Sequence, residues 1–130
     1  MDLPIRIETK SVSGNDGELY YKDILQIPDL KRWHIEIQDH IWLDDDFPSR
    51  TSILGDIEFV YDETDSTIKE LIDNITGEMI LCRFFVDKDR KDAYECNFVV
   101  ISYSRIPLDN GLIETDFSLQ SVGGMKALNE

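Results

Sequence analysis

Apolar and polar residues alternate along most of this chain, which is the pattern of strands that bury one face. In residues 33–38, Trp33, Ile35 and Ile37 fall on one face of an extended chain. Residues 112–120 alternate in the same way. The polar faces of these two predicted strands carry His34, Glu36 and Gln38 in the first, and Glu114, Asp116, Ser118 and Gln120 in the second.

Shorter patterns of the same kind predict strands over residues 3–9, 18–27, 57–61, 79–87 and 93–104. Residues 11–17 are rich in turn formers and are expected to separate the first two. One helix is expected between residues 67 and 77. Thr67 and Glu70 have the spacing of a capping box, and Gly77 is placed to end the helix. The apolar stripe of this helix is Ile68, Leu71, Ile72 and Ile75.

Many strands and a single helix predict a mainly β domain, a β-sandwich or partly closed barrel of two packed sheets with one flanking α-helix. A length of 130 residues fits one domain over residues 1–130. Residues 121–130 are expected to form a short C-terminal arm. Cys82 and Cys96 are expected to lie opposite one another in a hairpin, where a cytoplasmic setting favours free thiols.

Residues 39–56 are expected to form a long loop, because an acidic run and Pro48 interrupt the alternation there. A loop of this length is unusual in a compact domain and tends to be functional or disordered. Its large apolar side chains would suit contacts with another molecule. The candidate contact residues are Trp42, Phe47, Ile53 and Leu54.

The chain is strongly acidic, with 13 Lys and Arg against 27 Asp and Glu and a formal net charge of −14. This balance argues against tight binding of nucleic acid, which depends on cations that meet phosphates. A surface past which DNA slides is compatible with it, and so is a simple role in solubility. No apolar run is long enough to span a membrane and no secretory leader is evident, so synthesis and folding in a cytoplasm are expected.

Candidate catalytic or metal-binding residues are few. His34 and His40 lie near the acidic run Asp44, Asp45 and Asp46, a combination that could bind a divalent metal. The alternative is that His34 lies on the polar face of a strand and that the acidic run is simply solvated. No phosphate-binding glycine loop and no cysteine–histidine cluster is evident. The chain is therefore not expected to be an enzyme or to hold a metal or cofactor.

Two stretches resemble the tail-tube (major tail) proteins of long-tailed bacteriophages. Residues 27–46 run from a proline through a short loop and an alternating strand into an acidic loop. The family often has Gly where this chain has Asp29. The second stretch is the hairpin over residues 79–104 that follows the helix.

A third stretch, residues 101–123, resembles the closing segment of the same family. It has a strand, a turn around Pro107 and Asp109, and an alternating strand that ends in Leu119, Gln120, a small residue and glycine. Val122 is an extra residue relative to the tightest form of this ending. The three stretches occur in the family's order and cover most of the chain.

The resemblance implies a structural virion protein: a homo-oligomer of hexameric rings that stack into the hollow tail tube, through which double-stranded DNA passes. It implies tape-measure and tail terminator proteins as partners, no membrane anchoring, and assembly in the cytoplasm of a bacterial host. Open sheet edges that pair between subunits and an acidic lumen that repels phosphates suit this role. The expected lumen-facing residues are His34, Glu36, Gln38, Glu114, Asp116 and Gln120, and the candidate contact residues would meet the next subunit or ring. The alternative is that these polar faces meet bulk solvent.

Several alternatives share the fold or the composition. The same resemblance fits the tube of a contractile tail, a tailocin or a type VI secretion system, where a sheath protein is a further partner. A tail terminator or baseplate protein would form a single ring. From other classes, the chain could be a small metal-dependent enzyme that uses His34, His40 and Asp44–Asp46, or a monomeric sandwich that binds carbohydrate or protein.

Overall fold

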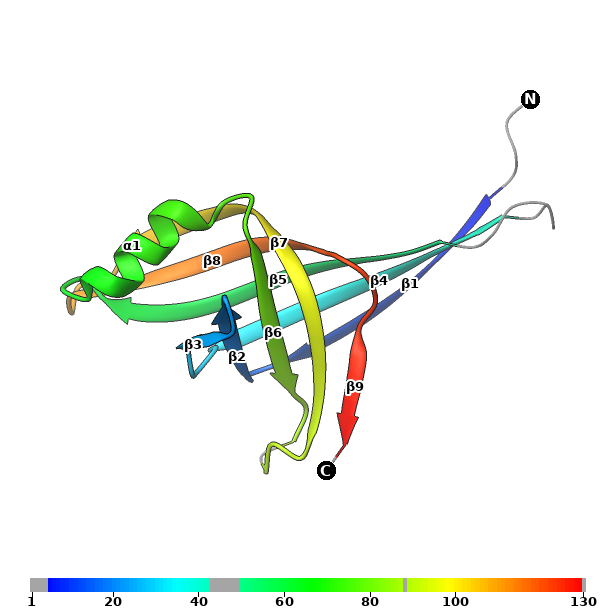
Figure 1. Cartoon of the computed structure of the whole chain (residues 1–130), viewed down its shortest axis with the longest axis horizontal. Coiled ribbons are helices and arrows are strands. Elements are labelled where there is room, and N and C mark those ends of the chain that lie inside the picture. Colours follow the sequence, from blue (N-terminus) through cyan, green and yellow to red (C-terminus); the bar gives the residue numbers. More distant parts are fainter. Residues whose placement is uncertain (1–4, 43–49, 88, 130) are drawn as a thin grey trace.

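The computed structural model describes residues 5–42, 50–87 and 89–129 and has one antiparallel sheet with one helix (Figure 1). Along the sheet the strands follow the order β1-β4-β5-β8-β7-β6-β2-β3, and β9 pairs with β7. The elements are β1 (Ile5–Gly14), β2 (Asp16–Tyr21), β3 (Ile24–Ile27), β4 (Arg32–Trp42), β5 (Arg50–Asp62), α1 (Ser66–Ile75), β6 (Met79–Phe85), β7 (Asp92–Pro107), β8 (Leu112–Ser121) and β9 (Lys126–Asn129). The mainly β prediction with one flanking helix is confirmed.

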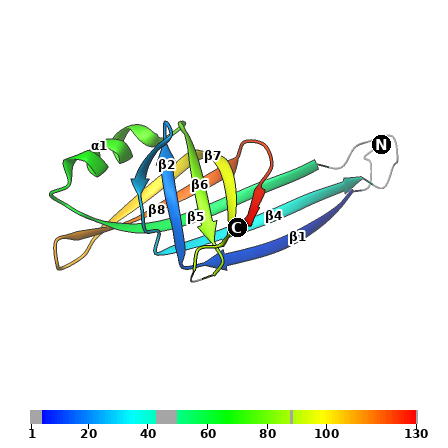
Figure 2. The same cartoon turned by 60° about the horizontal axis from the view of Figure 1, so that its bottom comes forward.

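The sheet folds over on itself, so that β6 and β2 lie across β4 (Figures 1 and 2). The ring of Trp33 in β4 stacks on Phe84 in β6, with 4.8 Å between the centroids. Burial of such aromatic side chains is the main favourable term that holds the two halves together. Within the described residues the strand order ends at β1 and β3 without closing, so the two packed halves belong to one open sheet and the word barrel describes the fold only loosely.

The chain passes from one half of the sheet to the other at a sharp corner between β1 and β2. The expected turn over residues 11–17 is wrong, because only Asn15 separates the two strands. The two glycines instead serve close packing: a Cβ on Gly14 would lie 2.6 Å from the Trp33 ring, and one on Gly17 would lie 2.8 Å from the Arg83 carbonyl oxygen. The Trp33 Nε1–H donates a hydrogen bond of 2.8 Å to the Asp16 carbonyl and fixes the corner.

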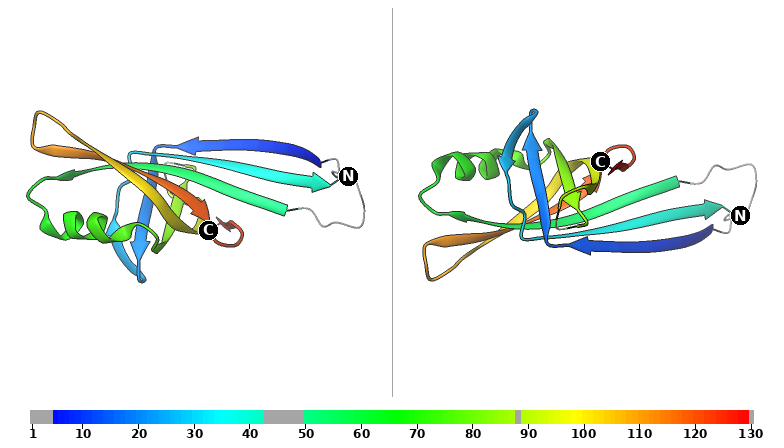
Figure 3. Two further views of the ribbon diagram at one scale, coloured as in Figure 1. Left: turned by 90° about the horizontal axis from the view of Figure 1, so that it is seen from above. Right: turned by 90° about the horizontal axis from the view of Figure 1, so that it is seen from below.

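The expected long loop over residues 39–56 is also wrong. Residues 39–42 complete β4 and residues 50–56 begin β5; residues 43–49 lie outside the described part. The two strands pair from Arg32 opposite Glu58 to His40 opposite Arg50. With β1 they form a three-stranded arm, made of residues 5–10, 37–42 and 50–53, that projects away from the helix (Figure 3).

The helix begins two residues earlier than its sequence signals suggest. Its N-cap is Asp65, whose carboxylate accepts a hydrogen bond of 3.1 Å from the Ile68 amide, so the expected capping box of Thr67 and Glu70 is wrong. The predicted apolar stripe is buried as expected. Gly77 has a φ of 84° and lets the chain turn into β6.

Two further boundaries differ from expectation. The segment 18–27 is two strands, β2 and β3, joined by a turn in which Lys22 and Asp23 have positive φ. In the C-terminal arm, β9 pairs with the start of β7, from Asp92 opposite Asn129 to Glu95 opposite Lys126. Cys82 and Cys96 lie opposite one another as predicted, and both are buried free thiols.

Candidate functional site: the outward face of β4, β5 and β8

The six polar residues predicted from two separate strands lie on one face of the folded sheet. In the register of β4, β5 and β8, His34 lies opposite Asp56 and Asp56 lies opposite Ser118. Residues directly opposite one another on paired strands point to the same side of a sheet. The same side therefore carries His34, Glu36 and Gln38 from β4, Leu54, Asp56 and Glu58 from β5, and Glu114, Asp116, Ser118 and Gln120 from β8. We call this surface the acidic face.

Carboxylates dominate the charge of this face. Its acidic residues are Glu36, Asp56, Glu58, Glu114 and Asp116. Arg32, at the start of β4, forms a salt bridge of 3.2 Å with Glu58, but its own side chain is 66% exposed. Such a pair contributes little to stability, since solvent screens it. The face therefore keeps an excess of negative charge.

The electrostatic strain of this clustering shows at Asp116. Burial raises the pKa of its carboxyl group, and the neighbouring charge of Glu114 raises it further. Arg32 acts in the opposite direction, and Asp56 adds a smaller upward contribution. Like charges and partial burial both disfavour the ionised form, so the negative charge of Asp116 costs folding free energy at neutral pH.

A hollow of about 460 Å³ lies on this face, lined by Ser13, Arg32, Trp33, His34, Asp56 and Asp116. Ser13, His34 and Asp56 follow one another across β1, β4 and β5, in the order of a serine–histidine–aspartate triad. A triad needs hydrogen bonds that couple the three side chains. Within the described residues no such bond joins them, and Ser118 Oγ donates to Asp56 instead, at 3.4 Å. The row has the residue types of a hydrolase without the contacts that would activate the serine.

The metal-binding hypothesis finds no support in the described part of the chain, where no group of three His, Cys, Asp or Glu residues could hold a metal ion. His34 lies on the acidic face. His40 belongs to β4, but its side chain and all of Asp44–Asp46 lie outside the described part.

The candidate contact residues separate in the structure. Ile53 is only 3% exposed and packs in the core, so the expectation that it is an exposed contact is wrong. Its neighbour Leu54 points to the acidic face and is 40% exposed. Trp42 ends β4 with its side chain outside the described part, and Phe47 lies outside it altogether.

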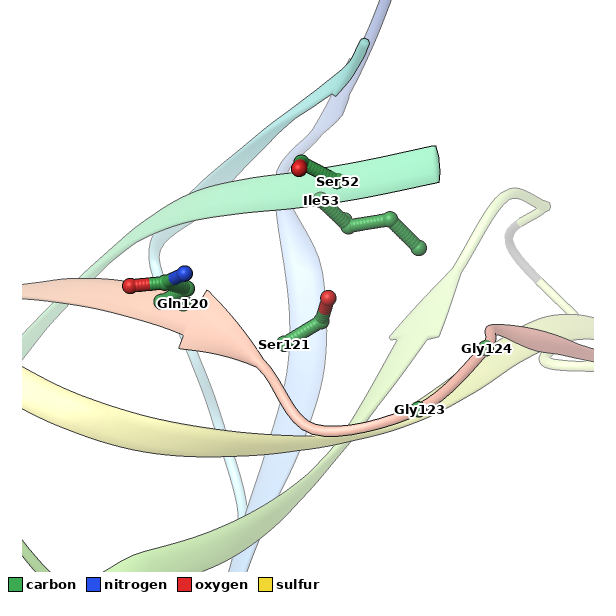
Figure 4. Close-up of a pocket in the computed structure, with 6 residues that line it drawn as sticks. All are labelled: Ser52, Ile53, Gln120, Ser121, Gly123 and Gly124. Carbon is green, nitrogen blue, oxygen red and sulfur yellow. The ribbon is translucent and has the colours of Figure 1, made fainter. Parts of the chain in front are cut away.

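A second hollow, of about 320 Å³, lies at the root of the arm. The pairing of β5 with β8 ends at Leu54 opposite Gln120, because the chain turns away after Ser121 toward β9. Ile53 and Ser121 point into the space between β5 and the segment that contains Gly123 and Gly124 (Figure 4). One edge of β5 in the arm is thus without a strand partner in the described part of the chain.

Two longer edges of the same sheet half are also without a strand partner among the described residues. β1 is the last strand on one side. On the other side, the pairing of β6 with β7 ends at Val99. Residues 101–107 of β7 therefore pair with β8 along one edge, and their other edge is open. Ile101 and Ile106 on this edge are each 52% exposed. Exposed apolar residues beside an unpaired edge favour strand addition.

Sequence reasoning missed the part of the acidic face that β5 contributes. Asp56 and Glu58 alternate with Ile57 and Phe59, and Gly55 continues that alternation in the strand. The signal is present in the sequence, but the predicted loop over residues 39–56 hides the first part of this strand. A Cβ at Gly55 would lie 3.3 Å from the Phe98 ring, so the glycine is required by packing in the strand.

Comparison with known families adds no identification: no family model matches the chain, and no curated protein matches it. In the described part of the chain, no helix has the length and apolar character needed to cross a bilayer.

Proposed function

We propose that this protein is a tail-tube subunit of a bacteriophage or phage-like particle, which forms hexameric rings that stack into a hollow tube. The observation that carries the proposal is the acidic face. Residues from β4 and β8, distant in sequence, lie on one polar surface of a sheet half that ends in two unpaired edges. A face of this kind suits the wall of a channel, and its edges suit closure of a ring.

Pairing between the two different unpaired edges would build a ring rather than a pair. Every neighbouring pair in the series β1-β4-β5-β8-β7 is antiparallel, so β1 and β7 run in the same direction. Pairing of β1 in one copy with residues 101–107 of β7 in the next would join two different edges in parallel. A contact between two different surfaces repeats around a rotation axis and closes only as a ring or a helix.

The charge of the acidic face supports passage of DNA rather than binding. Carboxylates repel the phosphate backbone over about a Debye length, roughly 8 Å at physiological ionic strength. Glu36, Asp56, Glu58, Glu114 and Asp116 would line the channel in every copy. DNA would then move through the tube without the cation contacts that hold it on other proteins.

In this role the protein is a component of the virion, assembled in the cytoplasm of its bacterial host. Its partners would be further copies of itself, a tape-measure protein that sets the length of the tail, and a terminator that caps it. A contractile particle would add a sheath on the outside. The proposed function needs no cofactor and no catalytic step.

Cross-linking tests the proposed edge pairing. Thr9 in β1 and Ser104 in β7 are exposed and lie on the two edges. In the double variant Thr9→Cys/Ser104→Cys, a short bismaleimide should join the cysteine at position 9 of one copy to the cysteine at position 104 of the next. The products should form a ladder of covalent oligomers that ends at the hexamer. The native thiols of Cys82 and Cys96 are buried and should not react.

In the control variant, Thr9→Cys/Thr67→Cys, the second cysteine lies at the exposed helix position 67 instead of at position 104. This variant should give no ladder. Equal ladders from both variants, or a product that stops at a dimer, would count against the edge pairing.

A further inference from the structure

Arg90 connects three segments of the chain that are far apart in sequence. It lies in the turn between β6 and β7, and its guanidinium group donates to both carboxylate oxygens of Asp16, with Nη2–Oδ1 at 2.6 Å and Nε–Oδ2 at 2.9 Å. It also contacts Glu18 at 3.5 Å and Asp29 at 3.2 Å. Charge-assisted bidentate contacts of this type are strong and directional.

The guanidinium is held in place from its other side as well. It lies over the Phe85 ring, with 4.7 Å from Cζ to the centroid, and donates to the Pro28 carbonyl at 3.4 Å. Arg90 itself has a φ of 57°, a conformation that side-chain-bearing residues adopt rarely and at a cost. Its contacts with Asp16, above all the hydrogen bond, raise the pKa of Arg90 further, which keeps the group charged.

The contacts converge on the corner at which the chain leaves β1 for β2. Asp16 is the first residue of β2, and its carbonyl accepts the Trp33 indole hydrogen bond. Pro28 and Asp29 belong to the connection that leads from β3 into β4, where Leu30 N donates to the Gly17 carbonyl at 2.8 Å. The Arg90 contacts therefore tie the two halves of the sheet together at this corner. We call this set, Arg90 with Asp16, Glu18 and Asp29, the corner clasp.

We propose that Arg90 is a positioning residue: through the corner clasp it fixes the β1–β2 corner and thereby the orientation of β1. Among the strands that the structure describes, β1 is paired with β4, and the corner at its end is a further attachment of β1 to the body. Without Arg90, the carboxylates of Asp16, Glu18 and Asp29 would face one another without their shared cation. The consequence for ring assembly rests on the proposed function, whereas the effect on β1 does not.

Amide hydrogen exchange on the monomer tests the proposal directly. In the Arg90→Ala variant, protected amides of β1 and of residues 16–18 should exchange about tenfold faster than in the native protein, because the partly exposed clasp contributes modestly to local stability. Amides of β5 and β8 should keep their native rates.

The control variant is Arg83→Ala. Arg83 has the same charge, a salt bridge of 2.9 Å to Glu95 and a position over the Tyr20 ring, but its contacts stay within the β2–β6–β7 part of the sheet. This variant should leave exchange in β1 unchanged. Arg90→Lys should rescue only weakly, since an ammonium group cannot bind both oxygens of Asp16 and stack on Phe85.

An Arg90→Ala variant with native exchange in β1, or with a uniform increase across all strands, would overturn the proposal. So would equal acceleration of β1 in the Arg83→Ala variant. If the native protein assembles, Arg90→Ala should raise the concentration needed for assembly about tenfold at unchanged β5 and β8 protection. If the native protein forms no rings at all, the proposed function fails, while the exchange result still decides the role of Arg90.

Discussion

The two halves of this sheet carry charge on their outward faces in different ways. On β2, β6, β7 and β9 a row of opposite residues reads Glu18, Arg83, Glu95 and Lys126, so charges of opposite sign alternate from strand to strand. On β4, β5 and β8 the opposite residues Arg32, Glu58 and Asp116 form one row. The rest of this face adds three carboxylates, Asp56, Glu114 and Glu36, and the imidazole of His34. One half neutralises its charge by cross-strand pairs, and the other concentrates carboxylates.

The two halves also differ in the length of their edges. The balanced half ends in β3, which has only four residues, and β9 covers the start of β7. Among the described residues, the acidic half ends in two longer unpaired edges, the ten-residue β1 and residues 101–107 of β7. Solubility depends on net charge and does not require that the charge be concentrated on one face. The coincidence of unbalanced charge and long open edges in one half is what the proposed tube explains.

The largest expected effect is a loss of folding stability when the aromatic contact between the two halves of the sheet is removed. Trp33→Ala removes a fully buried ring that stacks on Phe84, together with the hydrogen bond to the Asp16 carbonyl. We expect the free energy of unfolding to fall by about 3–5 kcal/mol, as for other buried aromatic truncations. Denaturant unfolding followed by fluorescence or circular dichroism measures it.

The matched variant Trp33→Phe keeps a ring against Phe84 and loses only the indole donor. It should cost much less, with a hydrogen-bond contribution of about 1 kcal/mol. Equal losses in the two variants would mean that the stacking does not hold the halves together.

A smaller effect on folding but a clear effect on DNA is expected from charge reversal on the acidic face. Glu114→Lys/Asp116→Lys should make assembled protein retain double-stranded DNA, with a salt dependence that steepens by about 0.9 in log–log slope for each phosphate contact. DNA co-sedimentation at several salt concentrations measures this. Glu63→Lys/Glu70→Lys, which changes the net charge equally at the helix end of the fold, is the control and should retain far less DNA.

The smallest expected effect is the pH dependence at Asp116. Its pKa is raised in the folded state, so relative to the unfolded chain its contribution is favourable at low pH and is lost as pH rises through the folded pKa. Asp116→Asn should therefore raise the melting temperature slightly at pH 7, and this gain should disappear below about pH 4, where the unfolded carboxyl is protonated too. A gain that is independent of pH would show that the carboxylate charge is not the cause.

The sequence pattern predicts which residues share a face of a strand better than it predicts where the strands and the helix begin and end. The alternation in β4 and β8 is strong, so which residues share a face followed directly from the period of two. That the two faces are one surface could not follow, because it depends on β5 lying between them in the strand order. The glycines at the β1–β2 corner led to a wrong prediction, because Gly14 and Gly17 are residues typical of turns. In the structure they are needed for packing: the Trp33 ring approaches Gly14, and Leu30 and the Arg83 backbone approach Gly17, too closely for a Cβ.

The β4–β5 region shows a second limit of local reasoning. The acidic run and Pro48 suppress the strand signal, but long-range pairing with β4 and β8 organises residues 50–56 all the same. Cross-strand contacts override local propensity in this way because sheet stability depends mainly on neighbouring strands. The Arg90 contacts were equally hidden, since they join residues 74 positions apart.

In the proposed tube, the acidic face lines the channel of each ring. Electron cryo-microscopy of the purified protein at high concentration, with a tail initiation complex added, shows where this face lies. We expect stacked six-fold rings in which Glu114 and Asp116 face the lumen and β1 lies beside residues 101–107 of β7 in the next copy. Particles that remain monomers, or rings that carry Glu114 and Asp116 on their outer surface, would contradict it.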